Sequence, residues 1–158
     1  MTSSDIKQHE IHHETCEIDS EIFSRIMNYK LNQQAVIAVG TTSCRTLESL
    51  PYLWLKLKDE LNTLCDEKTV AYWNELSGTL DSTKTTISNY RLEGEKIHFD
   101  CSLYILPGFG FTVIDQLITN FHLPKSSLMV LVASFMGYEL MMQCYEDAIK
   151  NHYAFYSF

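Results

Sequence analysis

The sequence lacks the long apolar stretches that membrane insertion requires. No apolar run reaches the roughly 18 residues of a transmembrane helix, so we expect none. Residues 1–5 (MTSSD) contain no apolar segment, which argues against a signal peptide. The composition is nevertheless that of a folded chain, with 46% hydrophobic and 20% charged residues. A length of 158 residues suits one domain better than two.

Paired cysteines are also missing. The 5 cysteines are widely spaced, and no C-x-x-C occurs. An odd count without a motif argues against a disulfide framework and against a four-cysteine zinc site. Reduced cysteines fit a cytosolic protein, so we expect a cytoplasmic location.

Positive charge is scarce. The chain has 12 basic and 20 acidic residues and a net charge of −8. Because nucleic-acid-binding domains normally carry a basic face, the charge taken alone argues against binding to nucleic acid.

Hydrophobic periodicity predicts an α/β fold, with a short and mostly parallel sheet covered by helices. Strands are expected at 36–40 and 101–106, where short apolar runs end in Gly40 and in Pro107-Gly108. Helices are expected at 19–31, 44–64, 126–136 and 138–152, with a break or kink at Pro51. Residues 66–100 are the least readable part of the chain.

The strongest local signal is the transition from the first strand to the next helix. Gly40 permits a tight turn, and Thr41, Thr42 and Ser43 precede a helix whose first N–H groups lack partners. With Arg45 in the first turn, this segment predicts a binding site for a carboxylate or phosphate. The alternative is ordinary helix capping, with Arg45 paired to Glu48 at the surface.

A histidine cluster precedes the first helix. His9, Glu10 and His13 satisfy the H-E-x-x-H pattern of zinc hydrolases, in which two histidines bind zinc and the glutamate acts as a base. The segment has no apolar flank that would bury it, and no third ligand is evident. A solvated polar loop is the simpler interpretation, and we expect no bound metal.

A third signal lies just ahead of the helix at 126–136. Thr119, Asn120, His122 and Lys125 stand together between apolar segments, as in loops that bind ligands and transfer protons. The alternative is a loop histidine followed by an ordinary helix cap. The segment 107–111 (PGFGF) is either a tight turn or a loop that offers an aromatic face to a base.

Taken in order, these segments resemble one family, the S-adenosylmethionine:tRNA ribosyltransferase-isomerases of queuosine biosynthesis. Residues 36–49 (VIAVGTTSCRTLES) are similar to that family's V-I-A-V-G-T-T-S-x-R-x-L-E-S, and residues 117–128 (LITNFHLPKSSL) to its L-I-T-N-F-H-L-P-x-S-T-L. Residues 107–115 match P-G-[FY]-x-[FY]-x-V-[VI]-D. His9, His12 and Glu14 match an H-x-x-H-x-E pattern.

The resemblance also has gaps. The first half of the family chain, including an inserted β-barrel domain, has no counterpart here, and residues 57–100 match nothing in the family pattern. Ala154 stands where the family has arginine, and the sequence stops before the family's G-D-A-M. We therefore expect residues 1–158 to be the carboxy-terminal part of a catalytic α/β domain, with a variable insertion at about 57–100. Such a part is an engineered fragment, a natural fragment or one subunit of a split enzyme. The absent half is expected to carry the basic surface that binds tRNA.

The resemblance implies a tRNA-modifying transferase and isomerase. The ribosyl part of S-adenosylmethionine, a consumed substrate, moves to the aminomethyl group of a deazaguanine base in tRNA, leaving epoxyqueuosine and releasing adenine and methionine. The expected partners are tRNA, S-adenosylmethionine, and the missing half or a second copy of the chain. The alternatives are a zinc-dependent hydrolase and a non-catalytic fragment that binds tRNA or a partner.

Chemistry assigns roles to the matching positions. Proton transfer near neutral pH suits histidine, a carboxylate clamp suits Arg45 and the adjoining turn, and Asp115 and Asn120 suit ribose hydroxyls. The catalytic candidates are His122, His9, His12, Glu14 and Asp115. The candidates for substrate binding are Thr41, Thr42, Ser43, Arg45, Thr119, Asn120, Lys125, Gly108 and Phe109.

Overall fold

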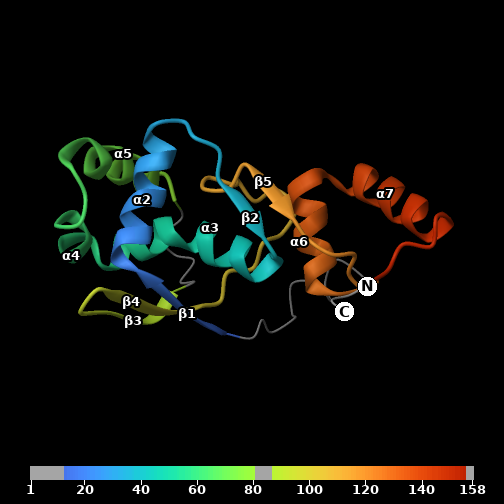
Figure 1. Ribbon diagram of the computed structural model, residues 1–158, viewed down its shortest axis with the longest axis horizontal. Coiled ribbons are helices and arrows are strands. Elements are labelled where there is room, and N and C mark those ends of the chain that lie inside the picture. Colours follow the sequence, from blue (N-terminus) through green and yellow to red (C-terminus); the bar gives the residue numbers. More distant parts are fainter. Residues whose placement is uncertain (1–12, 81–86, 156–158) are drawn as a thin grey trace.

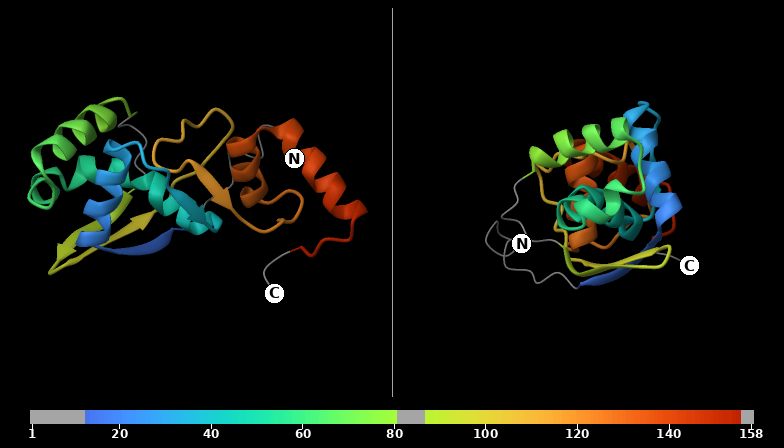
Figure 2. Two further views of the ribbon diagram at one scale, coloured as in Figure 1. Left: turned by 45° about the horizontal axis from the view of Figure 1, so that its top comes forward. Right: turned by 90° about the vertical axis from the view of Figure 1, so that its left-hand side faces the viewer.

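A computed structural model describes residues 13–80 and 87–155 (Figure 1). The helices are α2 (Ser20–Leu31), α3 (Thr41–Lys56), α4 (Lys58–Asn62), α5 (Glu67–Gly78), α6 (Ser127–Met136) and α7 (Tyr138–Lys150). The strands are β1 (Glu14–Asp19), β2 (Ile37–Val39), β3 (Ile87–Glu93), β4 (Lys96–Cys101) and β5 (Gln116–Ile118). The molecule is elongated: α2, α4, α5 and the sheet of β1, β3 and β4 form one end, α6 and α7 form the other, and β2 and β5 lie between them (Figures 1 and 2).

The expected α/β class is confirmed, but the direction of most strand pairs is not as expected. The larger sheet has the order β1-β4-β3 and is antiparallel throughout. Among the described strands, β2 and β5 form the one parallel pair. The hairpin β3–β4 and helix α5 lie within 66–100, the least readable stretch of the sequence. The described residues of 57–100 therefore contribute regular structure to the main body.

The strand expected at 101–106 is wrong. Strand β4 ends at Cys101, and residues 102–106 follow as extended chain outside any sheet. Leu103 and Ile105 are buried, which explains the alternating pattern, but the carbonyl of Leu103 accepts a hydrogen bond from Arg45 Nε at 3.0 Å. That carbonyl therefore bonds to a side chain, and the parallel partner of β2 is β5, further along the chain.

The helix predictions hold with shifted boundaries. The stretch expected at 44–64 begins at Thr41, and its break lies at Leu57, between α3 and α4. Pro51 lies inside α3 and is buried, and the helix continues past it. The expected break at Pro51 is therefore wrong.

The main hydrophobic core surrounds α3. Trp54 of α3 stacks on Phe23 of α2, with ring centroids 6.3 Å apart, and approaches Trp73 of α5 at 6.5 Å. All three rings are fully buried, and both indole N–H groups find acceptors, Asn74 Oδ1 and the carbonyl of Met27. Burial of these aromatic rings with satisfied polar atoms supplies much of the stability of this end of the molecule.

A second, smaller core holds the α6–α7 end together. Val132, Met141 and Tyr145 are its buried members, and Phe121 and Phe155 pack against them. Within the described residues no single helix is both long and apolar enough to cross a membrane, and α6 and α7 meet that test only as a pair bent by 116°.

A buried carboxylate joins α3 to the segment that leads into β5. Glu48 accepts hydrogen bonds from the backbone N–H groups of Thr112, Val113 and Ile114 at 2.8–2.9 Å, and from the hydroxyl of Thr112 at 3.3 Å. Burial raises the pKa of Glu48, and these donors oppose the rise. The carboxylate thus fixes the path of the chain just before β5.

Replacing this carboxylate should destabilise the whole fold. We expect Glu48→Ala to lower the free energy of unfolding by about 3 kcal/mol, because it strands buried N–H groups without acceptors. Urea denaturation followed by circular dichroism measures the change. The matched control is Glu75→Ala on the exposed side of α5, which should cost less than about 0.5 kcal/mol. Equal effects for the two variants would show that Glu48 has no special role.

Candidate functional site

The parallel pair brings two distant motifs to one place. In parallel strands both carboxyl ends meet at the same edge, and ligands in α/β proteins commonly bind there. An open hollow of about 390 Å³ lies at this edge. Its lining residues are Val39, Gly40, Thr41, Thr42, Ser43, Ile118, Thr119, Asn120 and His122.

Gly40 makes the junction between β2 and α3. Its φ of 92° and ψ of 151° lie in a region that residues with a Cβ rarely adopt. The N–H of Gly40 donates to the carbonyl of Ile118 at 2.8 Å, which ties the ends of β2 and β5 together. A glycine is therefore required where the chain leaves the sheet and enters the helix.

The amino terminus of α3 opens onto the hollow. The first helical hydrogen bond runs from Cys44 N–H to the carbonyl of Gly40 at 3.1 Å, so the N–H groups of Thr41, Thr42 and Ser43 precede it. The N-cap residue is Gly40, and Thr41, Thr42 and Ser43 lie inside the helix, so the alternative in which one of these hydroxyls is the N-cap is wrong. Thr42 and Ser43 are exposed, so the hydroxyls and the positive end of the helix dipole remain accessible to an anion.

His122 faces the same hollow from the other motif. Its Nε2 lies 2.9 Å from the hydroxyl of Thr119, and its backbone N–H donates to the hydroxyl of Tyr145 on α7 at 2.9 Å. Burial lowers the pKa of His122, so the imidazole is mainly neutral near pH 7 and can accept a proton.

Arg45 does not reach this hollow. It is only 9% exposed, it donates through Nε to the carbonyl of Leu103, and its Nη1 lies 2.5 Å from Glu14 Oε1. It lines a separate small cavity of about 20 Å³ between 103–105 and α6. The surface pair of Arg45 with Glu48, which was the alternative, is wrong as well, because Glu48 is buried and bonded to 112–114.

Comparison with known proteins adds an independent observation. The family described as queuosine biosynthesis protein matches residues 1–158. The chain belongs to this family. The resemblance seen in the motifs is thereby confirmed over the whole sequence.

Relatives show how much of a family protein this chain represents. Proteins named S-adenosylmethionine:tRNA ribosyltransferase-isomerase are 34% identical in Halothermothrix orenii and 33% identical in Coxiella burnetii, each over 158 residues. These matches cover 100% of this chain and 36% and 35% of the relatives. The crystal structure of S-adenosylmethionine tRNA ribosyltransferase from Thermotoga maritima has a TM-score of 0.61 and 28% identity, over 91% of this chain and 38% of its own. The chain therefore spans about a third of the length of the relatives that it matches.

Asp115 of this queuosine biosynthesis family member lies at the opposite end of β5 from the hollow. Its carboxylate accepts hydrogen bonds from Val36 N–H at 2.8 Å and from Lys30 Nζ at 3.0 Å. The bond from Val36 and the pairing with Lys30 lower the pKa of Asp115. The structure thus places Asp115 where it connects the start of β2 to the start of β5.

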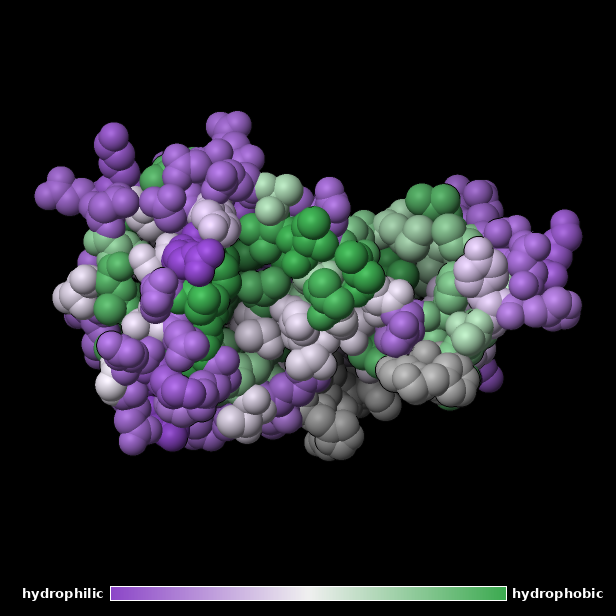
Figure 3. All heavy atoms as spheres, in the orientation of Figure 1, coloured by the Kyte–Doolittle hydropathy of each residue, from purple (hydrophilic) through white to green (hydrophobic). Residues whose placement is uncertain are grey.

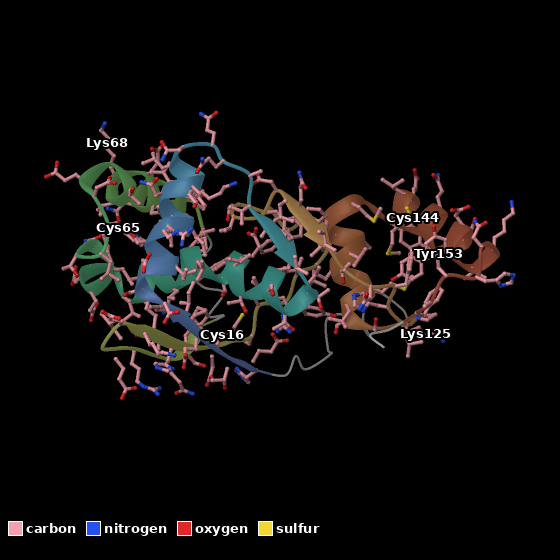
Figure 4. The ribbon with its side chains drawn as sticks, in the orientation of Figure 1. Cys16, Cys65, Lys68, Lys125, Cys144 and Tyr153 are labelled. Carbon is pink, nitrogen blue, oxygen red and sulfur yellow. The ribbon has the colours of Figure 1, made fainter. Side chains whose placement is uncertain are left out.

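The remaining expected site residues are scattered. Gly108, with a φ of 92°, belongs to a tight turn closed by Phe109 N–H and the carbonyl of Leu106, as in the turn interpretation. Phe109 packs edge-on against Phe111 with centroids 5.1 Å apart. Lys125 is exposed in the turn before α6 (Figure 4).

The histidine cluster falls mostly outside the described residues. His9, Glu10 and His12 lie there, whereas His13 is exposed and Glu14 is paired with Arg45. A solvated loop was expected for this segment, but Glu14 is the first residue of strand β1 and so does not belong to a loop. Within residues 13–80 and 87–155, no group of three or more His, Cys, Asp or Glu side chains is placed to hold a metal ion.

Two residues that support the site were missed by sequence reasoning. Glu48 stands in the L-E-S end of the first motif, but the motif does not reveal that its carboxylate is buried. Tyr145 is one of the buried residues of α7. Nothing in the spacing predicts that its hydroxyl bonds to the backbone of His122, because that contact joins positions in separate segments.

Proposed function

We propose that this chain is the carboxy-terminal part of an S-adenosylmethionine:tRNA ribosyltransferase-isomerase. The reaction transfers and isomerises the ribosyl part of S-adenosylmethionine onto 7-aminomethyl-7-deazaguanine in tRNA, giving epoxyqueuosine and releasing adenine and methionine. Family membership supports the assignment, and the observation that carries it is the single hollow formed by the two family motifs. Five free cysteines suit a reducing compartment such as the cytoplasm.

The hollow suits the charges of these substrates. An anion, either the methionine carboxylate or a tRNA phosphate, would accept hydrogen bonds from the first turn of α3 and from Thr42 and Ser43. Thr119 and Asn120 also line the hollow, and their polar side chains suit hydrogen bonds to ribose hydroxyls. His122, mainly neutral, would take the proton beside the sulfonium or pass one to departing adenine.

The other candidates would act around this hollow. We assign Arg45, Glu14 and Asp115 to holding its frame, since each already binds a structural partner. Gly108 and Phe109 shape the neighbouring turn. His9 and His12 remain candidates for proton transfer from the family pattern, and exposed Lys125 for contact with a tRNA phosphate.

The activity can be tested by supplying the missing part of a family protein. We expect the 158-residue chain alone to release no adenine from S-adenosylmethionine in the presence of tRNA carrying the aminomethyl-deazaguanine base. Fusion to the unmatched part of the Halothermothrix orenii relative should restore adenine release. In the fusion, His122→Ala should lower kcat by about a hundredfold, the usual minimum for loss of a proton-transfer group.

Two outcomes would contradict this assignment. Robust turnover by the isolated chain would show that the hollow needs no further polypeptide. A folded fusion that binds both substrates but forms neither adenine nor modified tRNA would argue for a non-catalytic binding role.

The anion site is tested by comparing Thr42, which lines the hollow, with Arg45, which does not. In the active fusion, Thr42→Val should raise one KM about tenfold, because it removes a hydrogen bond to a charged group. A rise for S-adenosylmethionine alone points to the methionine carboxylate, and a rise for tRNA alone points to a phosphate. Arg45→Lys should lower the melting temperature and leave both KM values within about threefold, or roughly 0.7 kcal/mol.

The control for this experiment is Thr79→Val, at the far end of α5, whose hydroxyl bonds only to its own helix in the described contacts. If Arg45→Lys raises a KM and Thr42→Val does not, the guanidinium binds the anion, and our placement of the site is wrong.

We also propose that another polypeptide covers the outer face of β2 and β5. Ile37, Val39 and Ile118 are 49%, 66% and 59% exposed on adjoining positions of the parallel pair, and Figure 3 shows hydrophobic side chains gathered over this middle region. Parallel sheets are normally covered on both faces. Because the relatives are almost three times as long as this chain (100% against 36% coverage), the occupant proposed is the rest of the family chain.

Without that occupant, the exposed face should drive self-association. We expect dimers or larger species of the 158-residue chain in analytical ultracentrifugation. Ile37→Lys should shift them to monomer, and Ile149→Lys, a control at the similarly exposed far end of α7, should not. A strictly monomeric wild-type chain at high concentration would contradict the proposal, as would loss of association only in Ile149→Lys.

A further inference from the structure

We infer that Tyr145 is a positioning residue, which holds the loop 119–122 so that the imidazole of His122 faces the hollow at the ends of β2 and β5. The inference rests on the proposed function only in taking His122 as a proton-transfer group. The contacts themselves come from α7, a helix that neither family motif includes and that does not line the hollow.

The loop that carries His122 has little regular structure of its own. Strand β5 ends at Ile118, and α6 begins only at Ser127. The hydroxyl of Tyr145 accepts the backbone N–H of His122 at 2.9 Å. Tyr145 is only 6% exposed, so this hydrogen bond is shielded from water and fixes the backbone from which the imidazole projects.

A cluster of aromatic rings strengthens the same attachment. Phe121 packs edge-on against Tyr145 and Tyr153, with centroids 5.1 and 6.1 Å apart, and lies tilted against Phe155 at 5.4 Å. Tyr145 and Phe155 also approach each other, at 6.0 Å. Edge-to-face rings at these spacings attract one another beyond simple burial. Tyr153 lies in the chain segment after α7, so the end of the described chain packs back onto this loop (Figure 4).

The ring contacts give a structural role to Tyr153 and Phe155, which lie after α7 and outside the two family motifs. The cluster belongs to the second hydrophobic core, separate from the core around α3. The α3 wall of the hollow thus depends on one core, and the His122 wall depends on the other. Tyr145 connects the second core to the histidine through a single hydrogen bond.

Loosening this contact should change the titration of His122 in a defined direction. Burial lowers the pKa of His122, and this residue is the titratable group among those that line the hollow. Tyr145, from α7, is the titratable group that bonds to it in the described structure. A loop that is released would admit water to the imidazole, so the pKa should rise toward its ordinary value of about 6.5.

The experiment compares Tyr145→Phe with wild type in the 158-residue chain by NMR. The His122 ring proton signal, assigned by its loss in His122→Gln, is followed against pH, and exchange of the His122 amide hydrogen is measured in parallel. We expect the pKa of His122 to rise toward its ordinary value, because the released loop would admit water to the imidazole. We expect amide exchange to be faster by about tenfold, because the N–H loses its acceptor.

Matched variants keep the result decisive. Tyr138→Phe removes an exposed hydroxyl from the same helix and should change neither quantity. Phe155→Leu loosens the ring cluster without touching the hydrogen bond and should raise the pKa by a smaller amount. If circular dichroism shows that Tyr145→Phe does not fold, the pKa of His122 in Phe155→Leu becomes the test of the inference.

Two results would overturn the inference. Unchanged exchange and an unchanged pKa would show that the hydroxyl does not hold the loop. Faster exchange with an unchanged pKa would show that it holds the backbone without placing the ring. Neither measurement needs S-adenosylmethionine or tRNA, so a failure of the proposed function would leave both outcomes readable.

Discussion

The carboxylate of Glu48 is the interaction on which the arrangement of the site depends. Its bonds to the N–H groups of Thr112, Val113 and Ile114 fix the chain to α3 just before β5 begins. Asp115 then accepts a hydrogen bond from the N–H of Val36, the residue just before β2, so the two short strands begin side by side. A pair of three-residue strands could not set its own register, because so few ladder hydrogen bonds are available. The carboxylates of Glu48 and Asp115 fix the register of β2 against β5 instead.

Sequence reasoning recovered the parts of the fold that have strong local signals. The first strand, its glycine turn and the helices at 19–31, 126–136 and 138–152 are near their expected positions, because periodicity and caps are local properties. The strand expected at 101–106 failed because Leu103 and Ile105 alternate as a strand does but pack into the core as extended chain. Which backbone groups pair across a sheet depends on contacts between distant segments, and composition does not encode them.

The residues of the candidate site could be predicted from the sequence, but their arrangement in space could not. Thr42, Thr119 and His122 could be selected as residues, but only the parallel pairing places them around one hollow. Arg45 shows the limit. Its position in the first turn of α3 favoured an anion site, but its guanidinium crosses to Glu14 and Leu103, whose positions in space no spacing reveals. A buried arginine needs partners, and the nearest ones in space bind it.

The use of Arg45 in this buried pair changes how an acidic chain could bind anionic substrates. The net charge is −8 and Arg45 is paired with Glu14, and none of the described residues that line the hollow is a lysine or an arginine. Its attraction for an anion comes from the oriented N–H groups at the start of α3 and from hydroxyls. Such groups act at short range and do not steer a polyanion from a distance. In the proposed enzyme, the hollow would therefore fix one anionic group in place, and the long-range attraction for tRNA would have to come from polypeptide outside this chain.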